Sequence, residues 1–321
     1  MSSLGEFDLI AAYFTRPVRR AALGVGDDCA LLAPAPGLQL ATSSDMLVEG
    51  RHFLSTVPPA HLGHKALAVN LSDLAACGAR PLGFTLALAL PRVDEPFLAG
   101  FSRGLLALAD LHDCELVGGD TTQGPLTLCI TVFGEVPPGA ALLRSGARAG
   151  DDLYVSGTVG DARLALEAFR GTLGLAGDAF DRVRRAMELP TPRVSLGLAL
   201  RGVATSAIDV SDGLLGDLGH VLRRSAVGAT VQADALPCSA DLAAQPPALR
   251  RLCGLAGGDD YELLFTAPPD RAADVARAAR ETGVPVTCIG RIEAEPGLRL
   301  VDTAGEPVAD GFASFDHFRT A

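Results

Sequence analysis

Five separate segments of the chain place an aspartate beside glycine, serine or threonine, and these residue types together can bind metal ions and phosphates. They are Gly26-Asp27-Asp28, Ser43-Ser44-Asp45, Asn70-Leu71-Ser72-Asp73, Gly118-Gly119-Asp120-Thr121-Thr122 and Asp209-Val210-Ser211-Asp212-Gly213. Glycine lets the backbone approach a ligand closely, and carboxylate and hydroxyl oxygens suit Mg²⁺. If the fold gathers these side chains, they can hold metal ions that bridge phosphates. The pattern favours phosphoryl-transfer or other ATP-dependent chemistry.

Each segment alone also has an ordinary structural explanation. Gly26-Asp27-Asp28 is good turn chemistry, and Ser43, Ser211 or Asp212 could cap a helix. The segment 118–122 could simply end a strand, although its amides would also suit a phosphate. Five segments of one kind in a single chain favour the ligand interpretation.

Asp73 is the hardest of these acids to explain by structure alone. It lies within an apolar stretch predicted to be helical, and an unpaired buried carboxylate is costly. Asn70 precedes it by three residues and so shares its helix face. Metal ligation or a hydrogen-bond network around Asn70 would relieve the cost.

The familiar nucleotide and hydrolase motifs are missing from the sequence. It contains neither a P-loop GxxxxGK[ST] nor a GxGxxG fingerprint, because Gly24-Val25-Gly26 continues into Asp27-Asp28. A GxSxG elbow and an HExxH motif are missing too. A nucleotide site would therefore be built in another way.

Further residues could contact a phosphate or a substrate. Arg144 stands on a glycine-bounded turn, where a phosphate contact is the alternative to ordinary solvation. His52 follows Glu49-Gly50-Arg51 and is either a surface histidine or a substrate contact. Gly257-Gly258-Asp259-Asp260 repeats the pattern of the 118–120 segment and opens an apolar strand. The phenylalanines near the end of the chain are more typical of core packing than of a ligand wall.

Composition limits the classes of function. The net charge of −11 argues against non-specific nucleic-acid binding. The seven cysteines form no CxxC pair or zinc spacing, so we expect free thiols in a reducing compartment. No signal peptide and no apolar run of membrane-spanning length are present. We therefore expect a cytoplasmic protein with no membrane partner.

Alternating elements predict an α/β (α+β) protein with two domains, 1–146 and 147–321, each a mixed sheet covered by helices. We expect helices at 4–14, 60–76, 97–111, 161–171, 193–201, 214–225 and 270–282. We expect strands at 38–42, 82–90, 115–117, 126–136, 153–155, 205–209, 229–233, 261–266 and 285–292.

The motifs, in this order, resemble those of the thiamine-monophosphate kinases, a family within the aminoimidazole ribonucleotide synthetase and selenophosphate synthetase superfamily. The resemblance covers nearly the whole chain. Its most specific parts are Gly26-Asp27-Asp28-Cys29-Ala30, the segments 45–53 and 69–76, and 257–265. It implies ATP-dependent phosphorylation of thiamine monophosphate to thiamine diphosphate with Mg²⁺. It also implies a homodimer in which the N-terminal sheets pair, with ATP near that interface.

The resemblance also implies roles for particular residues. Asp73, Asp120 and Arg144 would be catalytic, and Gly119, Asp120, Arg144 and Ser211 would contact ATP. Thiamine monophosphate would contact His52, Asp259 and Phe315. Mg²⁺ would be held, directly or through water, by Asp28, Ser43, Ser44, Asp45, Asp73, Asp120, Asp209 and Asp212.

Three positions depart from the family pattern. Asp259 stands where glutamate is usual, so its carboxylate reaches less far. Phe315 stands where tryptophan is common, which weakens stacking on the thiamine ring. Ser102 lies near a position that often carries tyrosine beside the nucleotide. None of these changes removes the expected metal ligands.

The expected mechanism is direct in-line transfer from ATP to the phosphate of thiamine monophosphate. That phosphate is already largely ionised at neutral pH, because its second pKa is about 6. Rival hypotheses are another ATP-dependent enzyme of the superfamily and a non-catalytic nucleotide or thiamine-phosphate binder. Selenophosphate synthetase usually carries a reactive cysteine in a glycine-rich N-terminal stretch, but the first cysteine here is Cys29. The superfamily's dehydratase usually ends in cysteine, but this chain ends in Arg319-Thr320-Ala321.

Overall fold

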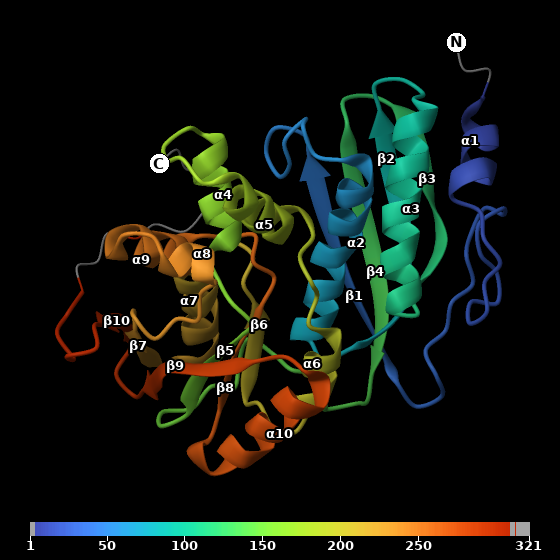
Figure 1. Cartoon of the computed structure of the whole chain (residues 1–321). Helices are drawn as coiled ribbons and strands as arrows, with labels where there is room; N and C mark the ends of the chain where they lie inside the picture. Colours follow the sequence, from blue (N-terminus) through green and yellow to red (C-terminus); the bar gives the residue numbers. More distant parts are fainter. Residues whose placement is uncertain (1–3, 309–311, 313–321) are drawn as a thin grey trace. The chain divides into compact units, whose positions relative to one another are not determined.

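The computed structural model describes residues 4–308 and 312 of the chain. The fold divides into two compact units (Figure 1). The first comprises Met1–Leu74 and Ala79–Gly139, and the second comprises Ala75–Gly78 and Ala140–Ala321. The chain passes from one to the other between Gly139 and Ala140, a few residues before Gly146.

The first unit contains a four-stranded sheet in the order β1-β4-β2-β3. Strand β4 pairs antiparallel with both β1 and β2, whereas β2 and β3 run parallel. The strands are β1 (Gln39–Val48), β2 (Arg80–Leu90), β3 (Glu115–Gln123) and β4 (Thr127–Val136).

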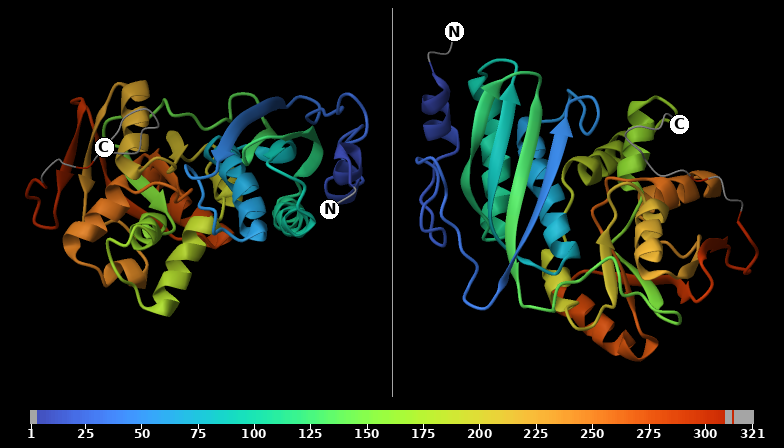
Figure 2. Two further views of the ribbon diagram at one scale, coloured as in Figure 1. Left: turned by 90° about the horizontal axis from the view of Figure 1, so that it is seen from above. Right: turned by 180° about the vertical axis from the view of Figure 1, so that it is seen from behind.

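Helices cover one face of this sheet. The helices of the unit are α1 (Glu6–Tyr13), α2 (Pro59–Ala76) and α3 (Glu95–Leu111). Helices α2 and α3 lie side by side over the strands, and in the view from behind the opposite face is turned to the viewer with no helix of the unit's described part in front of it (Figures 1 and 2). Leu128, Ile130 and Val132 of β4 are buried, while Cys129 and Thr131 alternate with them and are partly exposed. The sheet therefore has one covered face and one open face.

The second unit contains a six-stranded sheet in the order β10-β7-β9-β5-β8-β6. Its strands are β5 (Asp152–Ser156), β6 (Ser206–Asp209), β7 (Gly228–Gln232), β8 (Leu263–Ala267), β9 (Val286–Glu293) and β10 (Gly297–Val301). Its helices are α4 (Asp161–Phe169), α5 (Gly177–Glu188), α6 (Val194–Ala199), α7 (Leu214–Ser225), α8 (Ala240–Ala243), α9 (Pro247–Ala256), the 3₁₀ helix η1 (Pro269–Arg271) and α10 (Ala272–Thr282).

Alternating side chains of the second sheet face two apolar layers. Leu153 and Val155 of β5 belong to the core cluster that also contains the apolar face of α7. Tyr154, between them, stacks instead on Phe265 of the neighbouring strand, with ring centroids 5.3 Å apart. Residues on both sides of the predicted site segment 209–213 belong to the same core cluster, Ile208 of β6 and Leu214 of α7.

The structure confirms the expected fold class and corrects several elements. Strand β1 continues through Ser43-Ser44-Asp45 to Val48, and β3 continues through Gly118-Gly119-Asp120 to Gln123. The sequence analysis missed α5, α8, α9 and β10. In α5, Phe180, Val183 and Met187 recur at helical spacing, so a signal was present. No helix in the described part of the chain is long and apolar enough to span a membrane.

Candidate active site

In the first unit, Ser43 and Asp73 are joined directly. The Ser43 hydroxyl on β1 donates a hydrogen bond to the Asp73 carboxylate on α2. Two residues further along the same face, the Asp45 backbone N–H donates to Asn70 Oδ1 at 3.1 Å. Asn70 is 1% exposed and is itself fixed by donating to the Ala66 carbonyl at 3.0 Å. Asn70 therefore connects the strand to the helix. Asp73, which was expected to be buried, is half-buried, and its carboxylate accepts from Ser43.

Ser44 points to the other face of the same strand. Its hydroxyl lies 3.0 Å from Thr131 Oγ1 and donates to the Ile130 carbonyl at 3.1 Å, on the open face of the sheet. Successive side chains of a strand point to opposite faces. The hydroxyls of Ser43 and Ser44 are thus separated by the sheet, although both were predicted as metal ligands.

Gly119 and Asp120 lie within strand β3, not in a loop after it. Gly119 has a φ of +149°, and a β-carbon there would come 1.9 Å from the Leu86 carbonyl oxygen. The register between β2 and β3 shifts next to Phe84, so Val117 is the extra residue of a bulge. The segment 118–122 therefore continues the strand instead of ending it. Glycine is required at position 119 by close packing of two strands, and the Asp120 side chain is exposed.

His52 lies in the turn that follows β1. Its Nδ1 accepts a hydrogen bond from the Val48 N–H at 3.0 Å. A neutral imidazole that accepts at Nδ1 carries its proton on Nε2. In that form the N–H donor of His52 is Nε2.

Asp28 precedes strand β1 in the first unit. Its side chain is exposed, and its backbone N–H donates to Asp27 Oδ1 at 2.9 Å. Its carboxylate is therefore accessible to solvent, as the prediction of a metal ligand requires.

In the second unit, the loop between β6 and α7 folds around a buried carboxylate. Asp209 is the last residue of β6 and is 4% exposed. The N–H groups of Ser211 and Asp212 both donate to Oδ2 of Asp217, at 3.0 and 3.2 Å. Asp217 lies in the first turn of α7 and is 4% exposed. These two amides are therefore already occupied by a side chain.

A second turn, residues 257–262, is joined to this loop by backbone hydrogen bonds. The Asp259 N–H donates to the Ser211 carbonyl at 2.8 Å, and the Tyr261 N–H donates to the Val210 carbonyl at 2.9 Å. Both Asp259 and Tyr261 have left-handed backbones, with φ of 72° and 53°. Such conformations in residues other than glycine persist only where the surroundings hold them. The structure thereby brings Asp259 next to Ser211.

Two further acids fix the same turn. Both oxygens of Asp260 accept from the Gly160 N–H, at 2.9 and 3.0 Å. Glu262 is 4% exposed and accepts from Arg193 at 2.7 and 2.5 Å and from the Ser156 hydroxyl at 2.5 Å. A β-carbon on Gly157 would collide with this carboxylate at 1.9 Å. The acids of this turn are therefore enclosed by their own donors.

The electrostatics of the second unit raise the pKa of two of these carboxyl groups. Burial, together with the nearby charge of Asp212, raises the pKa of Asp217 to about 7, against the opposing effect of its two amide donors and Arg144. Burial also raises the pKa of Asp260 well above its usual value. Arg144 is exposed, and its carbonyl accepts from Ser225 Oγ at 3.3 Å at the end of α7. The charge of its guanidinium lowers the pKa of Asp217 and so opposes the effect of burial.

The predicted metal ligands fall into two sets. Asp28, Ser43, Ser44, Asp45, Asp73 and Asp120 belong to the first unit, and Asp209 and Asp212 belong to the second. In the part of the chain that is described, no group of three or more His, Cys, Asp or Glu side chains could hold a metal ion by itself. Mg²⁺ commonly uses only one or two carboxylates together with water and substrate phosphates. The oxygen donors of the Ser43–Asp73 pair, Asp45 and Asp120 therefore suit Mg²⁺ that arrives with a nucleotide.

Sequence reasoning missed Asp217, Arg193 and Glu262, and did not separate Asp260 from Asp259. The acidic residue in the first turn of a predicted helix and the paired acids after Gly258 were the available signals. Phe315, expected to contact the substrate, lies outside the described residues.

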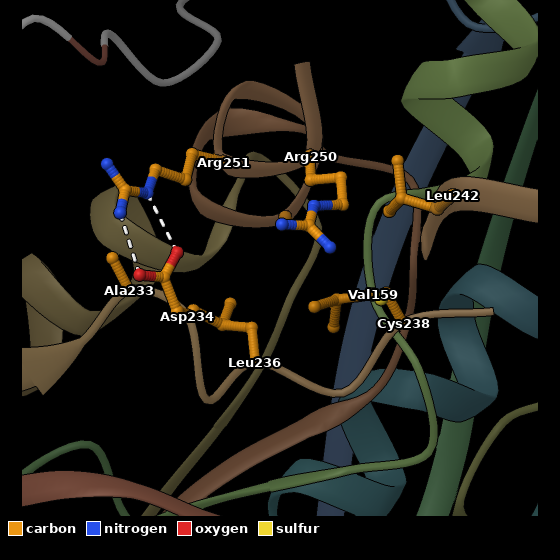
Figure 3. A pocket seen from close by; sticks show the side chains of 9 residues that line it. Val159, Ala233, Asp234, Leu236, Cys238, Leu242, Arg250 and Arg251 are labelled. Carbon is orange, nitrogen blue, oxygen red and sulfur yellow. Dashed lines mark hydrogen bonds and ion pairs between the residues drawn. The ribbon is translucent and has the colours of Figure 1, made fainter. Parts of the chain in front are cut away.

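A small cavity lies elsewhere in the second unit (Figure 3). It has a volume of about 60 Å³ and is lined by Val159, Leu236, Arg250, Arg251 and Asp234, among others. Arg251 forms a two-point ion pair with Asp234, at 2.8 and 2.7 Å. Among the residues that the structure describes, the lining includes no predicted site residue.

Both halves of the chain match known family models. Residues 26–136 match the N-terminal domain of AIR synthase related proteins, and residues 148–303 match the C-terminal domain. The thiamine-monophosphate kinase of Salmonella typhimurium is 48% identical over 326 aligned residues, which cover 98% of this chain and 99% of that protein.

Two solved structures are also similar. Thiamine-monophosphate kinase from Stenotrophomonas maltophilia has a TM-score of 0.84 and 46% identity, covering 90% of this chain and 92% of that one. A protein described as AaThiL in complex with AMPPCP and TMP has a TM-score of 0.77 and 29% identity, covering 89% of each chain.

Proposed function

The chain belongs to the thiamine-monophosphate kinases of the AIR synthase-related family, and from that premise we propose that it transfers the γ-phosphoryl group of ATP to thiamine monophosphate. The product would be thiamine diphosphate. The observation that carries the proposal is the backbone pairing of the Asp259 turn with the Ser211 loop. It brings a residue expected to bind thiamine monophosphate beside one expected to bind ATP. The complex of AaThiL with AMPPCP and TMP supports the same pair of ligands.

Mg²⁺ suits this chain's donors, and it would reduce the repulsion between the two phosphorylated substrates when bound. On the first unit, Ser43, Asp45 and Asp73 would hold it from the covered face of β1. Ser44 would serve a different ion, because its hydroxyl lies on the opposite face of the strand. Asp28 and Asp120 are exposed. Water or nucleotide oxygens would complete the coordination of a metal ion that these aspartates hold. Within the second unit, Asp209 and Asp212 are the expected metal ligands.

Transfer would proceed in line, with a phosphate oxygen of thiamine monophosphate attacking the γ-phosphorus and ADP leaving. The nucleophile needs no strong general base, because a phosphate monoester loses its second proton at a pH of about 6. The protein's own residues would bind and orient it. The Nε2–H of His52 can donate to a phosphate oxygen, and Arg144 can offset charge that develops during transfer. Asp120 would orient the nucleotide from strand β3.

We propose that two copies pair through the open face of the first sheet. Leu40 and Met46 lie on that face and remain 49% and 55% exposed, beside the hydroxyls of Ser44 and Thr131. Light scattering should give twice the chain mass, and Met46→Lys should shift the distribution toward single chains. An unchanged single-chain mass for the wild type would exclude the pairing and leave the reaction intact.

The direct test is to incubate the protein with ATP, Mg²⁺ and thiamine monophosphate and to separate the products by chromatography. Equal amounts of thiamine diphosphate and ADP are expected. ADP release only with the substrate of another superfamily enzyme would favour that enzyme class. Binding of ATP and thiamine monophosphate without conversion would favour a non-catalytic binding protein.

A further inference from the structure

The loop that carries Ser211 and Asp212 is held from both sides. On one side, the Asp217 carboxylate accepts from the amides of both residues, at 3.0 and 3.2 Å. On the other side, the Ser211 carbonyl accepts from the Asp259 N–H at 2.8 Å. The main chain of Ser211 is thus fixed at its nitrogen and at its oxygen.

The position of Asp217 is unfavourable unless its hydrogen bonds compensate. Its side chain is almost fully buried, close to the negative charge of Asp212. Burial of a carboxylate beside a second carboxylate is costly without donors. Here the donors are the main-chain amides of two residues expected to meet nucleotide and metal. The Asp217 N–H also donates to the Gly213 carbonyl at 3.0 Å, which ties the start of α7 to the loop.

Occupation of these amides decides which atoms the loop can offer to a ligand. A loop before a helix often binds phosphate through free N–H groups. The amides of Ser211 and Asp212 instead face inward to Asp217. The side-chain oxygens of the loop are not used in these bonds: Asp212 is exposed, and Ser211 is half-buried.

We propose that Asp217 is a positioning residue for the nucleotide and its metal: it fixes the 209–213 loop so that side-chain oxygens, rather than backbone amides, meet MgATP. This inference rests on the proposed function for the identity of the nucleotide. It requires that residue 217 supply a hydrogen-bond acceptor, and it does not require a charge there. Asparagine keeps such an acceptor, whereas alanine removes it.

The test compares Asp217→Asn and Asp217→Ala with a matched control, Asp151→Ala. Asp151 is also a buried carboxylate of the second unit, 3% exposed, and accepts from the Arg148 N–H at 2.9 Å and the Thr205 hydroxyl at 2.6 Å. It touches no predicted site residue through these bonds. Titration calorimetry with Mg²⁺ and AMPPCP gives Kd, steady-state turnover gives kcat and KM for ATP, and thermal unfolding gives Tm.

We expect Asp217→Ala to raise Kd and KM for the nucleotide by about tenfold or more, because small displacements of positioning groups have large effects. Asp217→Asn should remain within about threefold of the wild type, since the acceptor is kept. Asp151→Ala should lower Tm and leave Kd and KM unchanged. The inference would be overturned if Asp217→Asn and Asp217→Ala raised Kd and KM equally. It would also be overturned if Asp217→Ala lowered Tm and left Kd and KM unchanged.

A second measurement covers the case in which Asp217→Ala does not fold. Hydrogen exchange of the Ser211 and Asp212 amides should be slow in the wild type and in Asp217→Asn. Fast exchange of both in the folded wild type would overturn the inference. Failure of the proposed function is separate, because it would appear as normal AMPPCP binding without formation of thiamine diphosphate.

Discussion

In the first unit, Ser43, Asp45 and Asp120 lie within strands β1 and β3. In the second unit, Asp212 and Asp259 each lie in a loop between a strand and a helix. A strand fixes its side chains through its ladder of backbone hydrogen bonds. A loop has no such ladder. The second unit supplies the missing restraint with acids that accept from main-chain amides or arginine, namely the buried Asp217 and Glu262 and the half-buried Asp260.

Acidic residues near a site can therefore have two different roles. Exposed acids such as Asp120 and Asp212 are free to meet a ligand in solution. The carboxylate oxygens of buried acids such as Asp217 and Glu262 accept hydrogen bonds from the protein itself. Substitutions should therefore separate the two groups, with activity lost in the first and stability or geometry lost in the second.

The largest effect is expected at the strand-borne acids. Asp120→Asn should lower kcat by about 10³-fold, because it weakens the charge that orients the nucleotide and its metal. The free energy of unfolding should change by less than about 0.5 kcal/mol, since the side chain is exposed. Turnover and urea unfolding check this. Asp73→Asn should also abolish turnover while the fold survives.

Asp110→Asn is the matched control for Asp120→Asn. Asp110 is an exposed acid of the same unit that pairs with Arg16 at 3.0 Å. Its substitution should change kcat less than about twofold, as exposed ion pairs contribute little. Near-normal turnover of Asp120→Asn, with metal content confirmed, would contradict the assignment of Asp120.

A large effect on stability is expected at the loop-supporting acids. Arg193→Met should lower the free energy of unfolding by about 3–5 kcal/mol, because Glu262 would remain buried without its ion-pair partner. Urea unfolding measures this. The double variant Arg193→Met with Glu262→Leu should recover much of the loss, since no buried charge remains.

An exposed ion pair of the same unit provides the control for Arg193. Arg277→Ala removes a pair with Asp274 at 2.6 Å and should cost less than about 1 kcal/mol. If Arg193→Met were equally mild, the Glu262 pair would not hold the 257–262 turn, and the contrast between the two units would weaken.

A smaller, pH-dependent effect is expected in the first unit. There the carboxylate of Glu115, at the start of β3, also accepts hydrogen bonds from main-chain amides. Burial alone would raise its pKa, but the amides of Ala21, Arg19 and Arg20 lower it overall. A lowered pKa in the folded state stabilises the fold above the unfolded value, about 4.3, and this contribution is lost as pH falls through the folded pKa.

Glu115→Gln should therefore lower the free energy of unfolding by about 2 kcal/mol at pH 7. The difference from the wild type should shrink as the pH falls below the unfolded value. Urea unfolding at several pH values measures it. Glu281→Gln, at an acid 65% exposed, should show no such trend. A difference that stays constant with pH would mean that the carboxylate charge is not what stabilises this segment.

The sequence predicted most strands and helices because their apolar periods are clear, and it predicted the acidic segments because their residue types are distinctive. It did not predict which amides each carboxylate accepts from. Asp217 looks like an ordinary acid in the first turn of a helix, yet it folds back on residues 211 and 212. Gly119 was predicted as a ligand-binding glycine, and the sequence did not show that close contact with the Leu86 carbonyl also requires glycine there. Such pairings depend on tertiary placement, which no local pattern encodes.

The smallest effect is expected at Asp259, which combines an expected ligand contact with a constrained backbone. Its side chain is expected to reach thiamine monophosphate, while its backbone is held in a left-handed conformation with φ of 72°. Aspartate tolerates that conformation better than glutamate does. The departure from the family's usual glutamate therefore has a structural advantage that offsets its shorter reach.

Asp259→Glu should lower KM for thiamine monophosphate by about threefold through its longer reach, and should lower the free energy of unfolding by less than about 1 kcal/mol. Asp259→Asn keeps the backbone preference and loses the charge, so it should raise KM by about tenfold. Steady-state kinetics and urea unfolding of these two variants distinguish the effect of side-chain length from the effect of backbone conformation. If Asp259→Glu raised KM more than Asp259→Asn did, the backbone of this turn, and not the length of the carboxylate, would limit substrate binding.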